Sequence, residues 1–352
     1  MGQSDILFER RGIAGLITLN RPKALNAVTH TMVVALRAQL ERWANDPSVN
    51  RVVIAAAGER AFSAGGDIRA LYDLGRAGKH EQALQFWRDE YPLNAFIKRY
   101  CKPYIALIDG IVMGGGVGIS VHGSHRIAGD RFSFAMPEVG IGFFPDVGAT
   151  WFLPRMPGEL GAYCALTGER FNADDAVAAG VATHRIPSSQ FPALVDALTN
   201  ASSVDAVFAA FRRSGEQGPI MRRKATIDRL FAACDVETIL ENLDREALAD
   251  GAEAEWAQQT AAMIRTKSPL SLKIALAQVR AGRDWDFDTC MRAEFRIVSR
   301  IIHGYDFYEG VRAVIIDKDN QPNWKPTSLS GVTDIEVRRH FQPLGNSELV
   351  LN

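Results

Sequence analysis

Short apolar runs and one amphipathic stretch alternate along the first part of the chain. Residues 13–19 and 51–57 are rich in β-branched side chains and are bounded by turn formers, a pattern typical of strands. Between them, residues 30–46 carry apolar side chains every three or four positions and are followed by Pro47, which predicts a helix. A strand, a helix and a strand in this order favour an α/β fold with a parallel sheet covered by helices.

The pattern continues for one more cycle and then changes. The apolar run 104–108 predicts a strand that leads into the glycines 114–116, and a pair of strands is expected within 125–135. Beyond about residue 158 the chain is rich in Ala, Leu, Glu and Arg, as in 188–200 and 236–262, which predicts mostly helices.

The composition is typical of a soluble globular protein. Of 352 residues, 47% are hydrophobic and 23% are charged, which is enough apolar material for a sizeable core. Lys and Arg number 40 against 41 Asp and Glu, so the chain offers no bulk attraction to nucleic acid or to an anionic membrane. The most apolar stretch, 104–121, contains Asp109 and several glycines and is a poor membrane span. We expect neither a nucleic-acid partner nor a membrane.

The cysteines and the first residues bear on location. The four cysteines are far apart and form no CxxC pair, so we interpret them as reduced thiols: Cys101, Cys164, Cys234 and Cys290. Asp5 and Glu9 interrupt the N-terminal segment before an apolar signal-peptide run can form. Together these features predict a cytoplasmic protein.

Common catalytic and cofactor motifs are incomplete. The run 114–119 lacks the last glycine of a dinucleotide fingerprint, and the chain contains no GxxxxGK[ST] phosphate loop. Residues 118–122 miss the nucleophile elbow GxSxG at its last position, which disfavours a serine hydrolase. The seven histidines show no HExxH spacing, so no metal site is expected.

Two glycine clusters, 63–67 and 113–116, each follow a predicted strand and precede a predicted helix. Glycine lets a ligand approach the backbone closely, and N–H groups at the start of a helix point outward with a favourable dipole. Two such N–H groups aimed at one point would form an oxyanion hole, where a single donor contributes about 3 to 4 kcal/mol. The alternative is two tight turns without a ligand.

Two carboxylates lie in the apolar, glycine-rich stretch 134–148. Burying a carboxylate is costly unless it is hydrogen-bonded or functional, and apolar surroundings raise its pKa toward the range useful for proton transfer. Asp146 precedes a plausible helix at 147–153 and is equally suited to capping that helix. Glu138 has no evident capping role, so a functional role is favoured for it.

These segments resemble the crotonase (enoyl-CoA hydratase/isomerase) superfamily. The likeness rests on the segments 17–27, 61–68, 110–116 and 137–138. Within the superfamily the chain is most similar to the 3-hydroxyisobutyryl-CoA hydrolase branch, through the segments 113–123, 143–148, 309–319 and 324–326. The resemblance covers residues 13 to about 326.

The resemblance implies a spiral of strand-strand-helix repeats followed by a helical C-terminal region. We expect the spiral core, with the active site, over residues 1–200, the helical region over 201–326 and a tail over 327–352. Pro, Ser, Asn and Gly are frequent from about residue 322, which predicts a loosely held tail. In relatives the helical region often mediates trimer contacts, so a homo-oligomer of trimer type is expected.

The resemblance also implies a small acyl-CoA thioester as substrate, with no cofactor because coenzyme A is part of that substrate. Its carbonyl oxygen would lie between the N–H groups of Gly66 and Gly115. Coenzyme A would lie along residues of two segments: Lys23, Ala24, Leu25, Ala64 and Gly66. Its phosphates would contact Lys23 or Arg60.

One departure from the hydratases points to hydrolysis. Hydratases carry a first catalytic glutamate two residues beyond the glycine triplet, where this chain has Gly118, while the second is present as Glu138. Asp146 stands where hydratases have glycine. The resemblance therefore implies hydrolysis of a short hydroxyacyl-CoA, such as 3-hydroxyisobutyryl-CoA of valine breakdown.

In that reaction Glu138 either attacks the thioester to form a mixed anhydride or activates water, and Asp146 orients Glu138 or the substrate and moves a proton. Glu90, in a helix expected over 81–98, matches a substrate-contacting glutamate of the hydrolases. It would contact the acyl group together with Gly115, Glu138 and Asp146. The alternatives are an enoyl-CoA hydratase or isomerase and an acyl-CoA binding protein without turnover.

Overall fold

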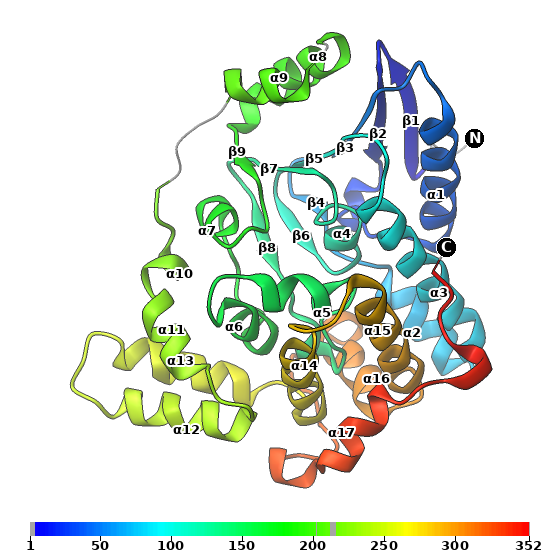
Figure 1. Ribbon diagram of the computed structural model, residues 1–352. Coiled ribbons are helices and arrows are strands. Elements are labelled where there is room, and N and C mark those ends of the chain that lie inside the picture. The colour runs from blue at the N-terminus through cyan, green and yellow to red at the C-terminus, as the bar shows by residue number, and fades with distance from the viewer. Residues whose placement is uncertain (1–3, 202, 212–215, 352) are drawn as a thin grey trace.

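Two sheets form the centre of the molecule (Figure 1). The computed structural model describes residues 4–201, 203–211 and 216–351. The larger sheet has six strands in the order β1 (Ile6–Arg11), β2 (Ala14–Leu19), β3 (Arg51–Ala56), β5 (Tyr104–Ile108), β7 (His125–Ala128) and β9 (His184–Arg185). The smaller sheet has three strands in the order β4 (Ala61–Ser63), β6 (Ile111–Met113) and β8 (Ser133–Ala135). Only β1 pairs antiparallel, with β2, and the other described pairs are parallel.

Successive strand pairs give one strand to each sheet. The pairs β3–β4, β5–β6 and β7–β8 repeat this arrangement, and each is followed by helical structure. The helices and helical turns concerned are α2 (Ile68–Arg76), α3 (His80–Lys98), α4 (Gly115–Gly118), the 3-10 turn η2 (Glu138–Ile141) and α5 (Ala149–Phe152). The predicted α/β fold with strand-strand-helix repeats is confirmed.

The helix α1 (His30–Asn45) shows why the periodic pattern folds as predicted. Thr29 accepts a hydrogen bond from the backbone N–H of Met32 and so caps the first turn. The apolar side chains of the predicted stripe, from Met32 to Trp43, are buried. Burial of this stripe fixes the helix to its neighbours because apolar surface leaves water.

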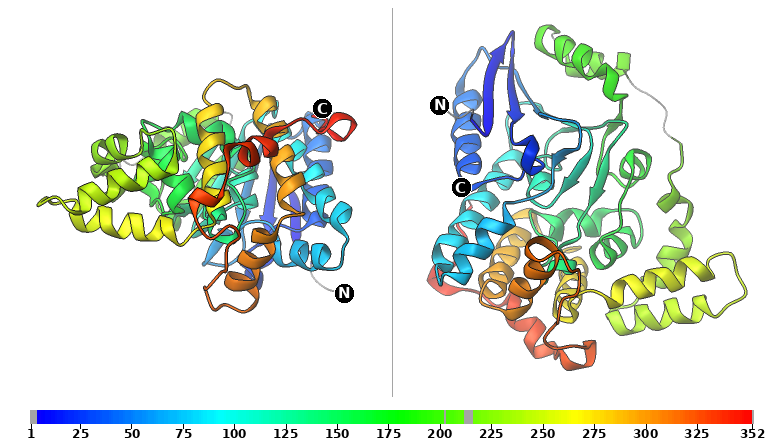
Figure 2. Two further views of the ribbon diagram at one scale, coloured as in Figure 1. Left: turned by 90° about the horizontal axis from the view of Figure 1, so that it is seen from below. Right: turned by 180° about the vertical axis from the view of Figure 1, so that it is seen from behind.

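The second half of the described chain is mostly helical, as predicted. Its helices are α6 (Leu160–Thr167), α7 (Ala173–Ala178), α8 (Phe191–Asn200), α9 (Val204–Phe211), α10 (Pro219–Arg222), α11 (Lys224–Leu230), α12 (Val236–Ala247), α13 (Ala254–Arg265), α14 (Pro269–Ala281), α15 (Phe287–Ile301), α16 (Tyr305–Val311) and α17 (Asp334–Phe341). The helical segment expected over 236–262 is two helices, and α12 and α13 form a hairpin that projects from the molecule (Figures 1 and 2).

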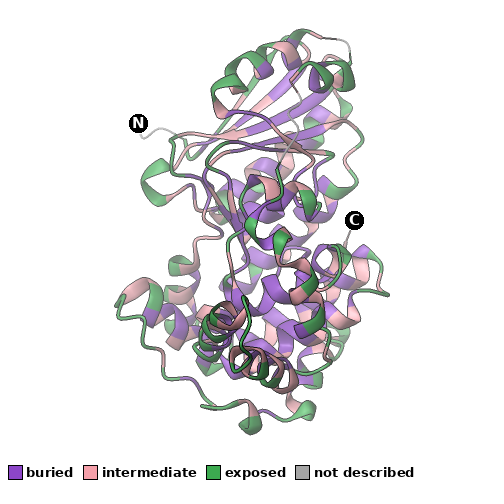
Figure 3. Cartoon of the chain, turned by 90° about the vertical axis from the view of Figure 1, so that its left-hand side faces the viewer, coloured by how far each residue is buried: buried purple, intermediate pink, exposed green. Residues whose placement is uncertain are grey.

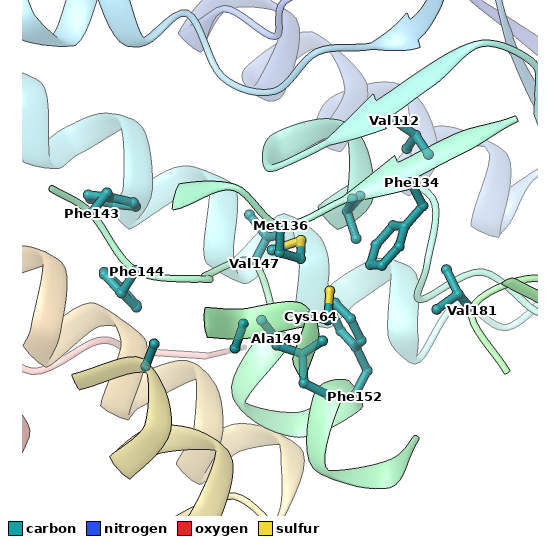
Figure 4. Packing of buried hydrophobic residues seen from close by; sticks show 14 of the residues in the cluster. Val112, Phe134, Met136, Phe143, Phe144, Val147, Ala149, Phe152, Cys164 and Val181 are labelled. Atoms are coloured by element: carbon teal, nitrogen blue, oxygen red, sulfur yellow. The ribbon is translucent and has the colours of Figure 1, made fainter. Parts of the chain in front are cut away.

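Two hydrophobic clusters hold these layers together, and Figure 3 shows buried residues along the strands and on the inner faces of the helices. The smaller cluster joins the large sheet to α8 and α9 through Leu107, Leu198 and Phe208. The main cluster runs from β2 and α1 to the C-terminal helices, and it includes Phe143, Phe144 and further residues of the segment after η2 (Figure 4).

The C-terminal segment folds back onto the helical region. The helix α17 packs against α14 and α15, and Val337 and Leu349 are buried. An ion pair of 2.9 Å joins Arg296 to Glu348. The prediction of a loosely held tail was wrong, because a few widely spaced apolar residues anchor a segment whose overall composition is polar.

Candidate active site

The small parallel sheet brings three predicted site residues together. Gly66 follows β4, Gly115 follows β6 and Glu138 follows β8, and these strands are neighbours in the order β4, β6, β8. Carboxyl ends of parallel strands meet at one edge of a sheet, so residues beyond these ends converge. All three line a cavity of about 660 Å³.

The two glycines predicted to form an oxyanion hole lie close together. A Cβ atom added to Gly115 would lie 3.1 Å from the backbone nitrogen of Gly66, so the two backbones are in close approach. Neither of their N–H groups donates a hydrogen bond to another described residue. Gly65 and Gly114, which precede them, have φ angles of 114° and 44°, a region that favours glycine. Two residues whose N–H groups have no described partner therefore line one cavity.

Glu138 faces these donors from the start of η2. The residue is 6% exposed, and its Oε1 would lie 3.3 Å from a Cβ atom on Gly114. Oε2 has no hydrogen-bond partner among the residues described. Burial raises the pKa of Glu138 well above its usual value, and the nearby charge of Asp146 raises it further. The carboxyl group is thus available to a substrate.

Asp146 does not cap the helix that follows it. The helix α5 begins at Ala149 after Gly148, while Oδ2 of Asp146 accepts a hydrogen bond of 2.9 Å from the hydroxyl of Tyr91. The capping alternative was wrong because the backbone turns at Val147 and Gly148 before α5 starts. Burial raises the pKa of Asp146 to about 7, and the Tyr91 hydrogen bond partly opposes this shift.

Glu90 lies at the buried end of the same cavity. Its helix α3 packs against both α1 and α15, so side chains on two of its faces are enclosed and Glu90 is only 1% exposed. A Cβ atom on Gly115 would lie 2.7 Å from its Oε1. Burial raises the pKa of Glu90 well above its usual value, and the charge of Asp146 adds to this effect.

Most of the residues predicted to meet coenzyme A line the same cavity. Ala24, Leu25 and Ala64 are among the lining residues, as is Gly66. Lys23 is exposed and lies next to this lining rather than in it, and its contact with phosphates stays a prediction. The turn before β4 is fixed by Asn26, whose side-chain amide donates to the carbonyls of Ala57 and Ala61.

Residues from the C-terminal half that no sequence motif predicts also reach the cavity. Lys267 and Asn320 line it, with the apolar Val314 and Ile315. The stretch 309–319 is part of the family resemblance, but no function is predicted for it. Its position at the cavity does not follow from the sequence, because it lies far along the chain from the glycine clusters. Lys267 supplies positive charge there, although partial burial lowers its pKa.

The described residues hold no candidate metal centre, and Ser120 is not paired with His122. Among them, no group of three or more His, Cys, Asp or Glu side chains is arranged to hold a metal ion. Ser120 donates to the carbonyl of Gly116, and His122 bonds the carbonyl of Val147, so the two are not paired with each other. No helix in the described part of the chain has the length and apolarity to span a membrane.

Known proteins resemble this chain over nearly its full length, both in sequence and in structure. Curated relatives named "3-hydroxyisobutyryl-CoA hydrolase, mitochondrial" from Danio rerio and Homo sapiens are 44% and 41% identical to this chain, over 99% and 98% of it and over 92% and 90% of their own length. Crystal structures of a carnitinyl-CoA dehydratase from Mycobacterium thermoresistibile and an enoyl-CoA hydratase from Rhodobacter sphaeroides 2.4.1 match with TM-scores of 0.93 and 0.91, each at 39% identity. These matches cover 99% of this chain and 99% and 100% of theirs.

The names of the curated relatives contradict the predicted cytoplasmic location, because these relatives are named mitochondrial. Widely spaced cysteines indicate a reducing environment but do not distinguish one reducing compartment from another. The model of the family described as enoyl-CoA hydratase/isomerase matches residues 14–341, nearly the whole chain. With relatives above 40% identity over almost its full length, the chain belongs to the enoyl-CoA hydratase/isomerase family.

Proposed function

We propose that the protein hydrolyses 3-hydroxyisobutyryl-CoA to 3-hydroxyisobutyrate and coenzyme A. The observation that carries this proposal is the Glu138 carboxyl group in one cavity with two backbone N–H groups that have no described partner, those of Gly66 and Gly115. The names of the curated relatives give the substrate. Water is the second reactant, and no cofactor is needed beyond the coenzyme A that the substrate carries.

The two ends of the cavity suit the two ends of this substrate. Glu90 and Asp146 are nearly inaccessible to solvent and mark the inner end of the cavity, whereas Val314 is exposed and marks its outer end. In the bound substrate the acyl group therefore lies at the inner end, and the coenzyme A part extends toward solvent at the outer end. Oε1 of Glu90 has no partner among the described residues and can accept a hydrogen bond from the acyl hydroxyl. Lys267, at the cavity wall, suits the phosphates of coenzyme A.

In the proposed reaction the C–S bond breaks and a new C–O bond forms at the carbonyl carbon. The negative charge that develops on the carbonyl oxygen is stabilised by the N–H groups of Gly66 and Gly115. Glu138 forms the new bond itself, giving a mixed anhydride, or removes a proton from the attacking water. The ionised Asp146 orients the reacting groups and relays the proton that the attacking water loses toward the leaving thiolate.

A single turnover in heavy-oxygen water separates the two routes. The anhydride route places the heavy oxygen in Glu138 when water attacks the Glu138 carbonyl and in the acid product when it attacks the acyl carbon. Direct attack by water labels the product and never Glu138. Label in Glu138 therefore supports the anhydride route.

Hydration of a double bond is a second candidate, because two solved structures at 39% identity are named as a hydratase and a dehydratase. Paired-glutamate chemistry would need a glutamate at position 118. A Cβ atom on Gly118 would already lie 2.8 Å from Cβ of Val147 and 2.9 Å from Nδ2 of Asn94. The absence of room for a side chain there favours hydrolysis.

The test measures thiol release from 3-hydroxyisobutyryl-CoA and, in parallel, hydration of crotonyl-CoA by absorbance. We expect release by the unmodified protein, a loss of about a thousandfold in Glu138→Gln, and no hydration. Glu41→Gln, on the exposed side of α1, is the control and should keep full activity. Hydration without thiol release would show a hydratase, and tight acyl-CoA binding without either reaction would show a binding protein. The trimer-type assembly stays a prediction.

A further inference from the structure

A buried carboxyl group outside the cavity holds the segment that carries Asp146. Glu294, on α15, is fully buried and is not among the residues that line the cavity. Its Oε2 accepts a hydrogen bond of 2.7 Å from the N–H of Gly148, and its Oε1 accepts one of 2.8 Å from the N–H of Thr150. Both oxygens of one side chain thus bind backbone donors just after Asp146.

The backbone at this place is strained. Val147 has a φ of 54°, in the left-handed region, which is unfavourable for a β-branched residue. Such a conformation persists only where the surroundings enforce it. Strained residues of this kind cluster at functional sites, and Val147 directly follows Asp146.

Three side chains enforce this conformation from both sides. His122 donates from Nε2 to the carbonyl of Val147 at 2.7 Å, since a carbonyl can only accept. Gln278 donates to the carbonyl of Pro145. Glu294 then fixes the next N–H group, that of Gly148. The peptide units on both sides of Asp146 are therefore held by side chains from other elements.

The carboxylate of Glu294 is suited to binding two backbone N–H groups, and no described ion pair gives another reason for its burial. Two N–H donors require two acceptor oxygens, which a carboxylate supplies and a carboxamide does not. No described ion pair involves Glu294, so it does not serve to neutralise a buried cation. A buried carboxyl group without a cation is costly, as shown by its pKa, which burial raises to about 8.

We propose that Glu294 is a positioning residue for hydrolysis: by binding Gly148 and Thr150 it holds Val147 in its strained conformation and keeps the Asp146 carboxyl group against Tyr91. Glu294 acts on the substrate only through Asp146. This inference rests on the proposed function, because the role of Asp146 is part of it. A displacement of about 1 Å at a reacting group can lower the rate a hundredfold, so a loosened turn affects turnover without contact to the substrate.

Glu294→Gln tests the inference, because it keeps the size of the side chain and removes one acceptor. We expect kcat for thiol release to fall by about tenfold or more with KM within about twofold of the unmodified protein. Glu294→Asp, which keeps both acceptors, should recover part of the loss. Asp175→Asn is the matched control, since Asp175 is also buried and accepts a backbone N–H, that of Met221.

A double-mutant cycle distinguishes positioning from a general loss of stability. In an Asp146→Asn background, adding Glu294→Gln should lower kcat by less than about twofold, since the residue through which it acts is already removed. Fully multiplicative effects of the two substitutions would overturn the inference, as would an unchanged kcat in Glu294→Gln. If Glu294→Gln does not fold, Glu294→Asp replaces it in the cycle, and the same comparison of kcat with and without Asp146→Asn tests the inference.

The inference and the proposed function can fail separately. Should the unmodified protein release no thiol, the proposed function fails, and a crystal structure of Glu294→Gln decides the positioning claim. The claim then requires that Val147 leaves the left-handed region or that the Tyr91 to Asp146 hydrogen bond breaks. An unchanged turn in that structure would overturn it.

Discussion

The hydroxyl of Tyr91 donates a hydrogen bond of 2.9 Å to Oδ2 of Asp146, and both side chains are buried. Burial and the neighbouring Asp146 charge raise the pKa of Tyr91, so the phenol stays neutral and remains a donor. No described ion pair involves Asp146, so the Tyr91 hydroxyl is an important stabilising partner for the Asp146 carboxylate. The Tyr91 hydrogen bond therefore favours the ionised form of Asp146, as does a smaller contribution from Trp87.

Tyr91→Phe should reduce activity by raising the pKa of Asp146 from about 7 to a higher value, since the lost hydrogen bond lowers that pKa. A hydrogen bond to a charged group contributes about 1.5 to 3 kcal/mol, so we expect kcat/KM at neutral pH to fall by about tenfold or more. The pH profile of thiol release should move toward higher pH on its acid side. Tyr100→Phe removes a hydroxyl bonded to Leu40 instead and should leave the profile in place. A profile unmoved in Tyr91→Phe would contradict the assigned role of Asp146.

The unmodified protein should show an acid limb in kcat/KM near pH 7 rather than near pH 4. Burial raises the pKa of Asp146 to about 7 and that of Glu138 well above its usual value, so both groups are protonated in acid. A protonated Glu138 is neither nucleophile nor base, and the rate therefore rises with pH as the carboxyl groups ionise. The measurement is thiol release between pH 5 and 9, corrected for hydrolysis without protein. A rate independent of pH between 5 and 8 would refute this assignment.

Gly115→Ala should abolish most activity without unfolding the protein. The added methyl group would lie 2.7 Å from Oε1 of Glu90 and 3.1 Å from the Gly66 nitrogen, within the space proposed for the carbonyl oxygen. Loss of an oxyanion-hole donor lowers kcat by about a hundredfold to a thousandfold, and obstruction of the site gives a loss of at least that size. Gly251→Ala is the matched control, because a Cβ atom there meets no described atom within 4 Å. Equal activity in both variants would exclude the oxyanion hole from this place.

The sequence predicts those elements whose signals are local. The strands β2, β3 and β5 and the helix α1 lie within about one residue of their predicted positions, because their periodicity is contained in one short window. The strands β4, β6 and β8 have three residues each. Periodicity is not measurable over such a length, so the small sheet that assembles the site was not seen as a unit.

The site was predicted where a residue has an unusual setting and was missed where its setting depends on distant elements. Glu138 stood out because a carboxylate in an apolar stretch has few structural uses. Glu90 looks like a solvent-facing helical residue in the sequence, and only packing of α3 between α1 and α15 buries it. Glu294 follows no motif, since the N–H groups it binds are more than a hundred residues away, and Lys267 follows none, since Gly140 beside it in the cavity is equally distant in sequence.

Gly118→Glu, which restores the first glutamate of the hydratases, should not produce a hydratase. A Cβ atom at position 118 would lie 2.8 Å from Val147 and 2.9 Å from Asn94, so a glutamate side chain forces the core apart. Overpacking of this kind costs about 1 to 3 kcal/mol, and an unpaired buried carboxylate adds to that cost. We expect a lower midpoint of thermal unfolding, reduced thiol release and no hydration of crotonyl-CoA. Gly251→Glu, on an open surface, should behave as the unmodified protein in all three measurements. A stable Gly118→Glu protein that hydrates crotonyl-CoA would mean that the packing of Val147 and Asn94 does not separate hydrolysis from hydration.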